Sequence, residues 1–172
     1  ESITFNIPNS DSGCVGGVCT ITLTSGEIAI GNAATSGVLF IRNTNGTRDN
    51  LLISGNNNSR IFNVAGGGNL TLDGVTVTRG RTAANQNNGG AITNAGSLKI
   101  LNSAVTDSSA SVTSNGGGLS NTGELILDNT IVARNTATLT SGGFFNNGGT
   151  VTVTNSAVTG NSASTGGCTT NL

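Results

Sequence analysis

Leu70-Thr71-Leu72 recurs along this chain as Leu98-Lys99-Ile100, Leu125-Ile126-Leu127 and Val151-Thr152-Val153, at intervals of 28, 27 and 26 residues. Each copy is followed five residues later by a valine, namely Val77, Val105, Val132 and Val158. A fixed period of this size is typical of a solenoid, because a unit this short cannot close a core alone. The repeats must therefore stack and bury their apolar faces against one another.

The pattern inside each unit indicates strands. Apolar and polar residues alternate, as in Leu70-Thr71-Leu72, and no segment keeps a helical period. We expect a first strand that carries Ile92, Leu119 or Phe145, a second that carries the recurring triplet, and a third that ends on the valine. The sequence therefore predicts an all-β fold, a parallel β-helix (β-solenoid) with three strands per coil.

Turn residues form columns, by which we mean equivalent positions in successive coils. One column holds Asn94, Asn121, Asn147 and Asn171, a second holds Asn102, Asn129 and Asn155, and a third holds Gly68, Gly96, Gly123 and Gly149. Asn and Gly both tolerate positive φ, which a tight corner selects. Stacked amides also bond along the axis, so we expect two structural asparagine ladders. For any single residue the alternative is an ordinary exposed loop asparagine.

Residues 1–60 keep strand character while the repeat blurs. Segments 3–7, 20–24, 27–30, 38–41 and 51–53 read as strands separated by Gly, Asn and Ser turns. We expect two irregular first coils, continuous with regular coils of 26–28 residues over 61–172, in a single domain. At about 27 residues per coil the 172 residues make about six coils and a rod near ~30 Å long.

Composition narrows the classes of function. Seven basic and eight acidic residues give a net charge of -1, so no basic patch favours nucleic acid or an anionic membrane. No apolar run has the length of a membrane span, and the first residues lack the layout of a signal peptide. We expect a soluble chain, either a mature product or an excised fragment, without membrane insertion.

The cysteines indicate a compartment. Cys14-Val15-Gly16-Gly17-Val18-Cys19 places two thiols around a Gly-Gly turn, where a small disulfide loop can close. A metal site is the competing interpretation, but the chain has no histidine and no second cysteine pair. A disulfide implies an extracellular or other oxidising setting. Cys168 shares a column with Ala91, Gly118 and Phe144, so we expect a small buried residue, with intermolecular pairing as the alternative. Glycosylation sequons begin at Asn45, Asn57 and Asn69.

The stretches at 94–106, 121–133 and 147–159 carry a family resemblance. Asn-Ala-Gly-Ser-Leu-Lys-Ile-Leu-Asn-Ser-Ala-Val-Thr and its two counterparts resemble the repeats of right-handed parallel β-helix proteins on bacterial surfaces, of the autotransporter-passenger and polymorphic outer-membrane types. The lead-in Ile3-Thr4-Phe5 and the segment 21–27 are similar to the start of such helices. The resemblance implies right-handed coiling and a cell-surface location. It implies no activity, because this fold hosts enzymes, adhesins and passive stalks.

An enzyme hypothesis has one candidate site. Asp73 and Asp128 share a column on either side of Leu101, roughly 10 Å apart by strand spacing, and Lys99 lies on the same face. Paired carboxylates cleave glycosides, and carboxylates that hold calcium beside a basic residue serve polysaccharide lyases. The chain has no histidine for a Ser-His-Asp triad and no Trp or Tyr to stack on a sugar. We expect no catalytic residue, no metal and no cofactor.

Other charged and polar columns have structural interpretations. Arg79, Asp107 and Arg134 alternate in sign over three coils, which predicts an ion ladder that fixes register. Flat threonine arrays on β-solenoids can order water, so ice binding is a third class of function. The column Thr71, Lys99, Ile126, Thr152 is interrupted by a charge and an aliphatic residue, which disfavours it.

The two ends suggest a function. Residues 168–171 restart a coil in register before Leu172 ends the chain, and the first strand carries Ile3, Phe5 and Ile7. These three residues, Cys168 and Leu172 are our candidates for contacts between copies by strand addition. We expect a non-enzymatic extracellular structural protein that stacks head to tail into a filament or scaffold, with matrix or cell-surface polysaccharide as a further partner. The alternative is a fragment of a larger surface adhesin or stalk.

Overall fold

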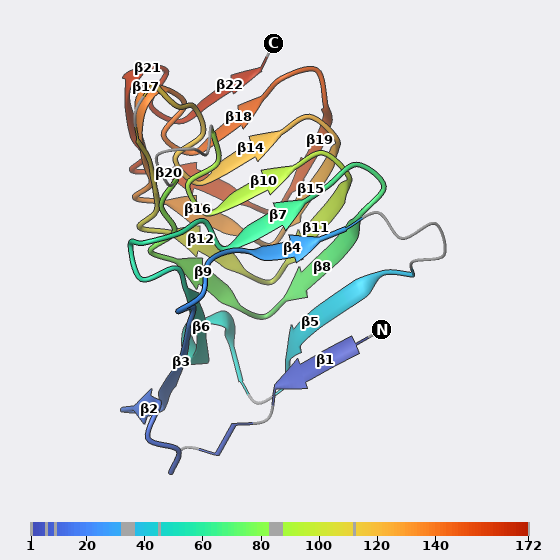
Figure 1. Cartoon of the computed structure of the whole chain (residues 1–172), viewed down its shortest axis with the longest axis vertical. Helices are drawn as coiled ribbons and strands as arrows, with labels where there is room; N and C mark the ends of the chain where they lie inside the picture. Colours follow the sequence, from blue (N-terminus) through green and yellow to red (C-terminus); the bar gives the residue numbers. More distant parts are fainter. Residues whose placement is uncertain are drawn as a thin grey trace.

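A computed structural model of the chain describes residues 2–5, 7–8, 10–31, 37–44, 46–82, 88–111 and 113–171. Its elements are short strands and one 3-10 turn, η1 (Arg48–Asn50), and the strands stack into a rod of parallel sheets (Figure 1). The coils near β18 and β22 lie at one end of the rod, and β1, β2 and β3 lie at the other.

Three sheets run the length of the rod, and a fourth occupies one corner. Sheet A consists of β1 (Ser2–Phe5), β5 (Leu39–Asn43), β8 (Asn69–Asp73), β11 (Ser97–Leu101), β15 (Glu124–Asp128) and β19 (Thr150–Thr154). Sheet B consists of β2 (Cys14–Val15), β3 (Val18–Thr22), β6 (Leu51–Ser54), β9 (Thr76–Thr78), β12 (Ala104–Thr106), β16 (Ile131–Ala133) and β20 (Ala157–Thr159). Sheet C consists of β4 (Ile28–Ile30), β7 (Phe62–Val64), β10 (Ile92–Asn94), β14 (Leu119–Asn121), β18 (Phe144–Asn146) and β22 (Thr169–Asn171). Sheet D consists of β13 (Ser109–Ala110), β17 (Thr136–Thr140) and β21 (Ser162–Thr165).

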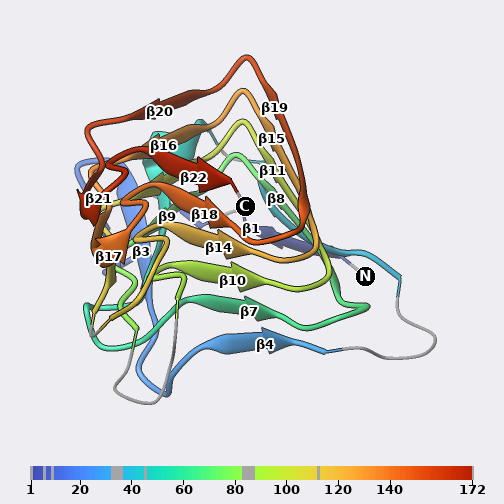
Figure 2. The same cartoon turned by 90° about the horizontal axis from the view of Figure 1, so that it is seen from above.

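Each coil crosses sheets C, A and B in turn, so the predicted three-strand coil is confirmed. Five complete turns separate β1 from β19 in the six-stranded sheet A, and β20 and β22 carry the spiral further, which agrees with about six coils. Figure 2 looks down the rod from its C-terminal end. The chain passes β18, β19 and β20 counterclockwise as it approaches the viewer, so the β-solenoid is right-handed.

The interior is built from the columns that the repeat predicts. Leu70, Leu98, Leu125 and Val151 pair in register across sheet A, and the column Val77, Val105, Val132 and Val158 does the same across sheet B. In the middle coils these side chains are fully buried or nearly so. Burial of each such leucine contributes about 1.5–3 kcal/mol, so the stacked coils supply the core that no single coil has.

In one coil the register of the first strand differs from the register that the sequence repeat predicts. Phe144, not Phe145, pairs with Leu119, and Asn146, not Asn147, pairs with Asn121. The corner between β18 and β19 holds one residue more than the corner between β14 and β15, and Gly148 takes a φ of 74° there. Alignment on the second strand therefore places the first strand of this coil one residue too late. Phe144 and Phe145 are 8% and 7% exposed, so both sides of β18 are covered.

The glycine column at 68, 96, 123 and 149 has a different cause from the predicted one. None of these four glycines has positive φ. A Cβ on Gly123 would instead collide with the carbonyl oxygen of Gly96 and with the backbone of Ala95 in the coil before it. The corner selects glycine because successive turns of backbone approach each other closely.

The first coils follow the same path with less regularity. All five predicted strands of residues 1–60 are present as β1, β3, β4, β5 and β6, with shifted boundaries. β1 pairs with β5, β3 with β6 and β4 with β7, all parallel. The strand β2 folds back on β3 and runs antiparallel to it.

Candidate functional site

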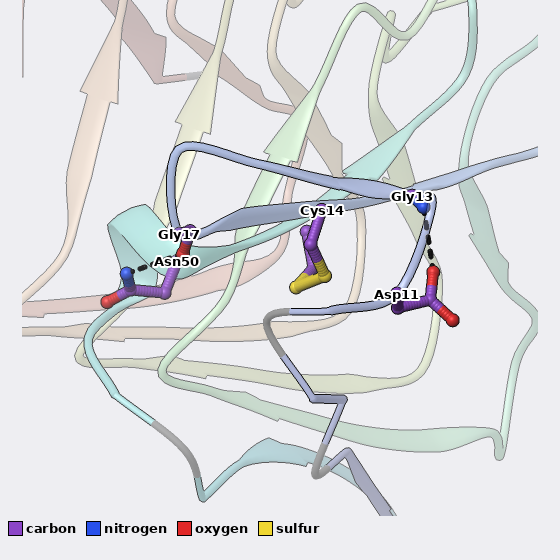
Figure 3. The surroundings of a disulfide bond; sticks show 6 residues. Asp11, Gly13, Cys14, Gly17 and Asn50 are labelled. Atoms are coloured by element: carbon purple, nitrogen blue, oxygen red, sulfur yellow. Dashed lines mark hydrogen bonds between the residues drawn. A yellow bond between two sulfur atoms is a disulfide. The ribbon is translucent and has the colours of Figure 1, made fainter.

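The N-terminal end of sheet B is closed by a disulfide hairpin (Figure 3). Cys14 and Cys19 face each other across β2 and β3 and are bonded, which confirms the predicted pair. Gly16 and Gly17 turn the chain with φ of 60° and 82°. The hairpin is tied down by Asn50, whose Nδ2 donates to the carbonyl oxygen of Gly17 at 2.9 Å. Because β2 occupies the outer edge of β3, this end of sheet B is already paired.

The first asparagine ladder runs through the buried corner between sheets C and A. Asn94 Nδ2 donates to Asn121 Oδ1 at 2.6 Å, Asn121 Nδ2 to Asn146 Oδ1 at 2.8 Å, and Asn146 Nδ2 to Asn171 Oδ1 at 2.6 Å. Asn147, the predicted third member, is exposed on the corner outside the ladder. Asn94, Asn121 and Asn146 are at most 3% exposed, so each bond replaces a solvation that a buried amide has lost.

The second asparagine column lies on the exposed corner between sheets A and B. Asn102, Asn129 and Asn155 share a φ of 49°, the left-handed conformation that the turn chemistry predicted. Asn129 Nδ2 donates to Asn102 Oδ1 at 2.9 Å, and Asn102 Nδ2 donates to Asp73 Oδ1 at 2.8 Å. Asn155 Nδ2 donates to Asp128 Oδ1 at 3.5 Å instead of to Asn129. The amide ladder therefore consists of Asn102 and Asn129, and the carboxylate of Asp73 extends it.

A third ladder, which we did not predict, lies in the corner after sheet B. Ser108, Asn135 and Asn161 are 27 and 26 residues apart and 0–8% exposed. Asn135 Oδ1 accepts from the backbone N of Ser108 at 3.0 Å, and Asn161 Oδ1 accepts from Asn135 Nδ2 at 3.0 Å. The spacing of 27 and 26 residues could have revealed this column in the sequence, since its members directly follow Asp107, Arg134 and Gly160, which occupy equivalent positions in successive coils.

The charged column Arg79, Asp107, Arg134 is only partly an ion ladder. Arg134 donates to Asp107 through Nε at 2.8 Å and Nη2 at 2.9 Å, and the two side chains are 64% and 41% exposed. The hydrogen bond from Arg134 lowers the pKa of Asp107, and desolvation partly offsets it. Arg79 makes no ion pair with a described residue, although its positive charge also lowers the pKa of Asp107. All three residues have positive φ.

Both carboxylates of the candidate catalytic trio accept hydrogen bonds from neighbouring side chains. Asp73 and Asp128 flank Leu101 in register, as the column requires. Asp73 accepts from Arg42 Nε at 2.9 Å through one oxygen and from Asn102 through the other. Lys99 is exposed on the outer face of sheet A. Within the described ranges no three His, Cys, Asp or Glu residues are grouped as metal ligands would be.

The predicted end contacts differ in accessibility. Ile3 is 44% exposed on β1, an edge strand of sheet A, whereas Phe5 and Ile7 are half-buried against the core. Phe144 pairs with Thr169, so the column of Cys168 contains Gly143 and not the predicted Phe144. The Cys168 thiol is free and exposed, not buried as expected, because no coil covers the last one in the structure. Leu172 and the sequon residue Asn45 lie outside the described residues.

Strands β19, β20, β21 and β22 are the edge strands of all four sheets at the C-terminal end. The core columns end here without a cover, since Val153 is 47% exposed whereas Leu127, one coil earlier, is fully buried. Among the described residues these four edge strands pair with no further strand, and the apolar interior beside Val153 is partly open.

No protein-family description, curated protein or solved structure matches this chain. None of the helical segments in the described ranges has the length and apolarity that a membrane crossing requires.

Proposed function

We propose that this chain is a non-enzymatic structural rod of an extracellular or cell-surface scaffold, and that its C-terminal edge receives the N-terminal coil of another copy. The exposure of one core column of sheet A rises sharply at the C-terminal end. Leu72, Ile100 and Leu127 are fully buried, and Val153 at the end of the same column is 47% exposed. An apolar, unpaired sheet edge of this kind favours strand addition.

The N-terminal end offers a partly complementary surface. β1 and β4 are edge strands of sheets A and C, and the 44% exposed Ile3 lies on β1. In sheet B the disulfide hairpin already covers β3, so docking there involves β2 or leaves that sheet unpaired. A contact between opposite ends is heterologous and continues from copy to copy, which gives a filament.

Two features support an extracellular setting. The Cys14–Cys19 disulfide is stable in an oxidising compartment and is reduced in most cytosols. The right-handed β-solenoid also fits the resemblance of its repeats to autotransporter-passenger and polymorphic outer-membrane proteins of bacterial surfaces.

A second function is favoured by the register of the last strand. Thr169–Asn171 pairs with Phe144–Asn146 without a shift, and Asn171 accepts from the asparagine ladder as an interior member would. The same edge then suits further coils of a longer surface stalk or adhesin. In that case isolated rods of residues 1–172 stay monomeric.

Sedimentation velocity and electron microscopy over a range of concentrations test the proposal. We expect the unmodified chain to form end-to-end oligomers and Val153→Lys to abolish them, since the lysine places a charge in the open interior. Thr152→Lys is the matched control, because Thr152 lies on the same strand and faces outward. Monodisperse single rods at the highest soluble concentration, or equal loss of assembly in both variants, would reject self-stacking.

A further inference from the structure

The outer face of sheet B forms the floor of a cleft, with residues that project higher on both sides of it. Val77 and Val105 point into the core, so their strand neighbours Thr78 and Thr106 point outward. These two threonines are nevertheless only 5% and 6% exposed, and Thr106 Oγ1 donates to Thr78 Oγ1 at 3.3 Å. Small outward residues are this well covered when taller groups stand on both sides of them.

One wall comes from the loop that joins β5 to β6. Arg48 Nη1 donates to the carbonyl oxygens of Asn129 at 2.7 Å and Ser103 at 3.2 Å, and its own carbonyl accepts from Thr76 Oγ1 at 2.9 Å. These bonds hold η1 of the first coils against the corner of later coils, and they place Asp49 on the rim. The other wall is the column Arg79, Asp107, Arg134. The cleft between the walls has a volume of about 510 Å³.

The two walls carry different charges that remain for a ligand. Arg134 is neutralised by its two bonds to Asp107, whereas Arg79 is exposed and has no carboxylate within ion-pair distance among the described residues. Across the floor of threonine hydroxyls lies the carboxylate of Asp49, also exposed. The cleft therefore offers one free guanidinium, a short row of hydroxyls and one free carboxylate.

From this arrangement we infer that the cleft binds an acidic saccharide, with a uronate carboxylate on Arg79 and sugar hydroxyls on the threonine floor and on Asp49. A guanidinium pairs with a carboxylate through two parallel hydrogen bonds, and carboxylates and hydroxyls accept or exchange bonds with sugar hydroxyls. The two acidic and two basic side chains that line the cleft give it no net positive charge, so it lacks the basic surface that a run of phosphates requires. The inference rests on the proposed scaffold function and names the class of its matrix polysaccharide partner.

Titration with oligogalacturonate, followed by calorimetry or NMR at low ionic strength, tests the inference. A neutral glucose oligosaccharide of equal length is the reference ligand. We expect the acidic ligand alone to bind, with affinity that falls as salt is added, and Arg79→Gln to weaken binding by about tenfold or more. Lys99→Gln removes the same charge from the outer face of sheet A and should leave the affinity unchanged. Thr78→Val, which removes one floor hydroxyl, should weaken binding by a few fold.

Two outcomes would overturn the inference: no binding of oligogalacturonate at the highest soluble concentration, or equal loss in Arg79→Gln and Lys99→Gln. Circular dichroism of each variant establishes that it folds. The titration is also run in the Val153→Lys background, in which we expect single rods. Saccharide binding and end-to-end assembly therefore succeed or fail separately.

Discussion

The regular coils from β7 to β18 and the first coils from β1 to β6 share the same sheets, but different interactions hold them together. In the regular coils, like residues stack in columns, with Leu98 and Leu125 at most 1% exposed and asparagine amides bonded from coil to coil. In the first coils, Leu39 belongs to the same column as Leu98 and is only half-buried. The side chains of this column are therefore less completely buried toward the N-terminal end.

Bonds from loops compensate in the first coils. The Cys14–Cys19 disulfide closes a hairpin on sheet B, Asn50 ties that hairpin to η1, and Arg48 reaches carbonyls of two later coils. Arg60, nearly buried, donates to Glu27 at 2.7 Å and joins β4 to the coil that follows it. A coil of this solenoid therefore needs both a neighbouring coil and a fixed register, and the register comes either from repeated columns or from individual cross-links.

Truncation of a leucine in the core column of sheet A should destabilise the regular coils more than the first coils. Leu98→Ala leaves a cavity among fully buried side chains and should lower the free energy of unfolding by about 2–5 kcal/mol. Leu39→Ala makes the same change where the leucine is half-buried, so the loss should be at most half as large. Urea unfolding of both variants measures the difference. Equal losses would mean that the first coils are packed as tightly as the regular ones.

The Cys14–Cys19 disulfide should stabilise the first coils and have little effect on the regular coils. Replacing both Cys14 and Cys19 by serine removes a short covalent loop, which is worth about 2 kcal/mol by loop-closure entropy. We expect faster hydrogen exchange in β1, β3 and β6, and unchanged protection in β11, β12 and β14, because the regular coils keep their columns.

Cys168→Ser is the control for that experiment, since its free thiol is exposed and forms no bond within the described residues. It should leave the exchange pattern as it is. Loss of protection along the whole rod in the double variant would show that the hairpin stabilises every coil and not only the first ones.

A feature of this fold could be predicted from the sequence only where it repeats from coil to coil. Stacked residues leave a periodic signal, so the columns of Leu98, Val105 and Asn121 were readable from spacing alone. The shift at Asn146 was not, because one extra residue in a corner changes the register of the first strand while the second strand stays in step. The Arg48 cross-link and the cleft beside it were missed for a related reason. The cross-link joins coils that are far apart in the chain through the side chain of Arg48 alone, and a contact that occurs once leaves no periodic pattern in the sequence.

The exposed ion pair between Arg134 and Asp107 should make only a small contribution to the stability of the regular coils. Arg134 lowers the pKa of Asp107 below its ordinary value of 3.8, so the ion pair stabilises the fold at pH values above about 4. That contribution disappears as pH falls through the lower, folded-state pKa. The Asp107 carboxylate also raises the pKa of Arg134. This shift does not affect stability near pH 4, because the stabilisation it provides is lost only when the pH rises above the pKa of a free arginine. Both side chains are substantially exposed, so the loss should stay under about 1 kcal/mol.

Asp107→Asn keeps the shape of the side chain and tolerates the positive φ of 52°, so it isolates the charge. Thermal unfolding from pH 7 to below 4 should show the parent chain slightly more stable at neutral pH and the two proteins converging in acid. A gap that stays constant with pH would trace the difference to packing or hydrogen bonding. A gap well above 1 kcal/mol would mean that this exposed pair, and not only the buried columns, holds the register of the regular coils.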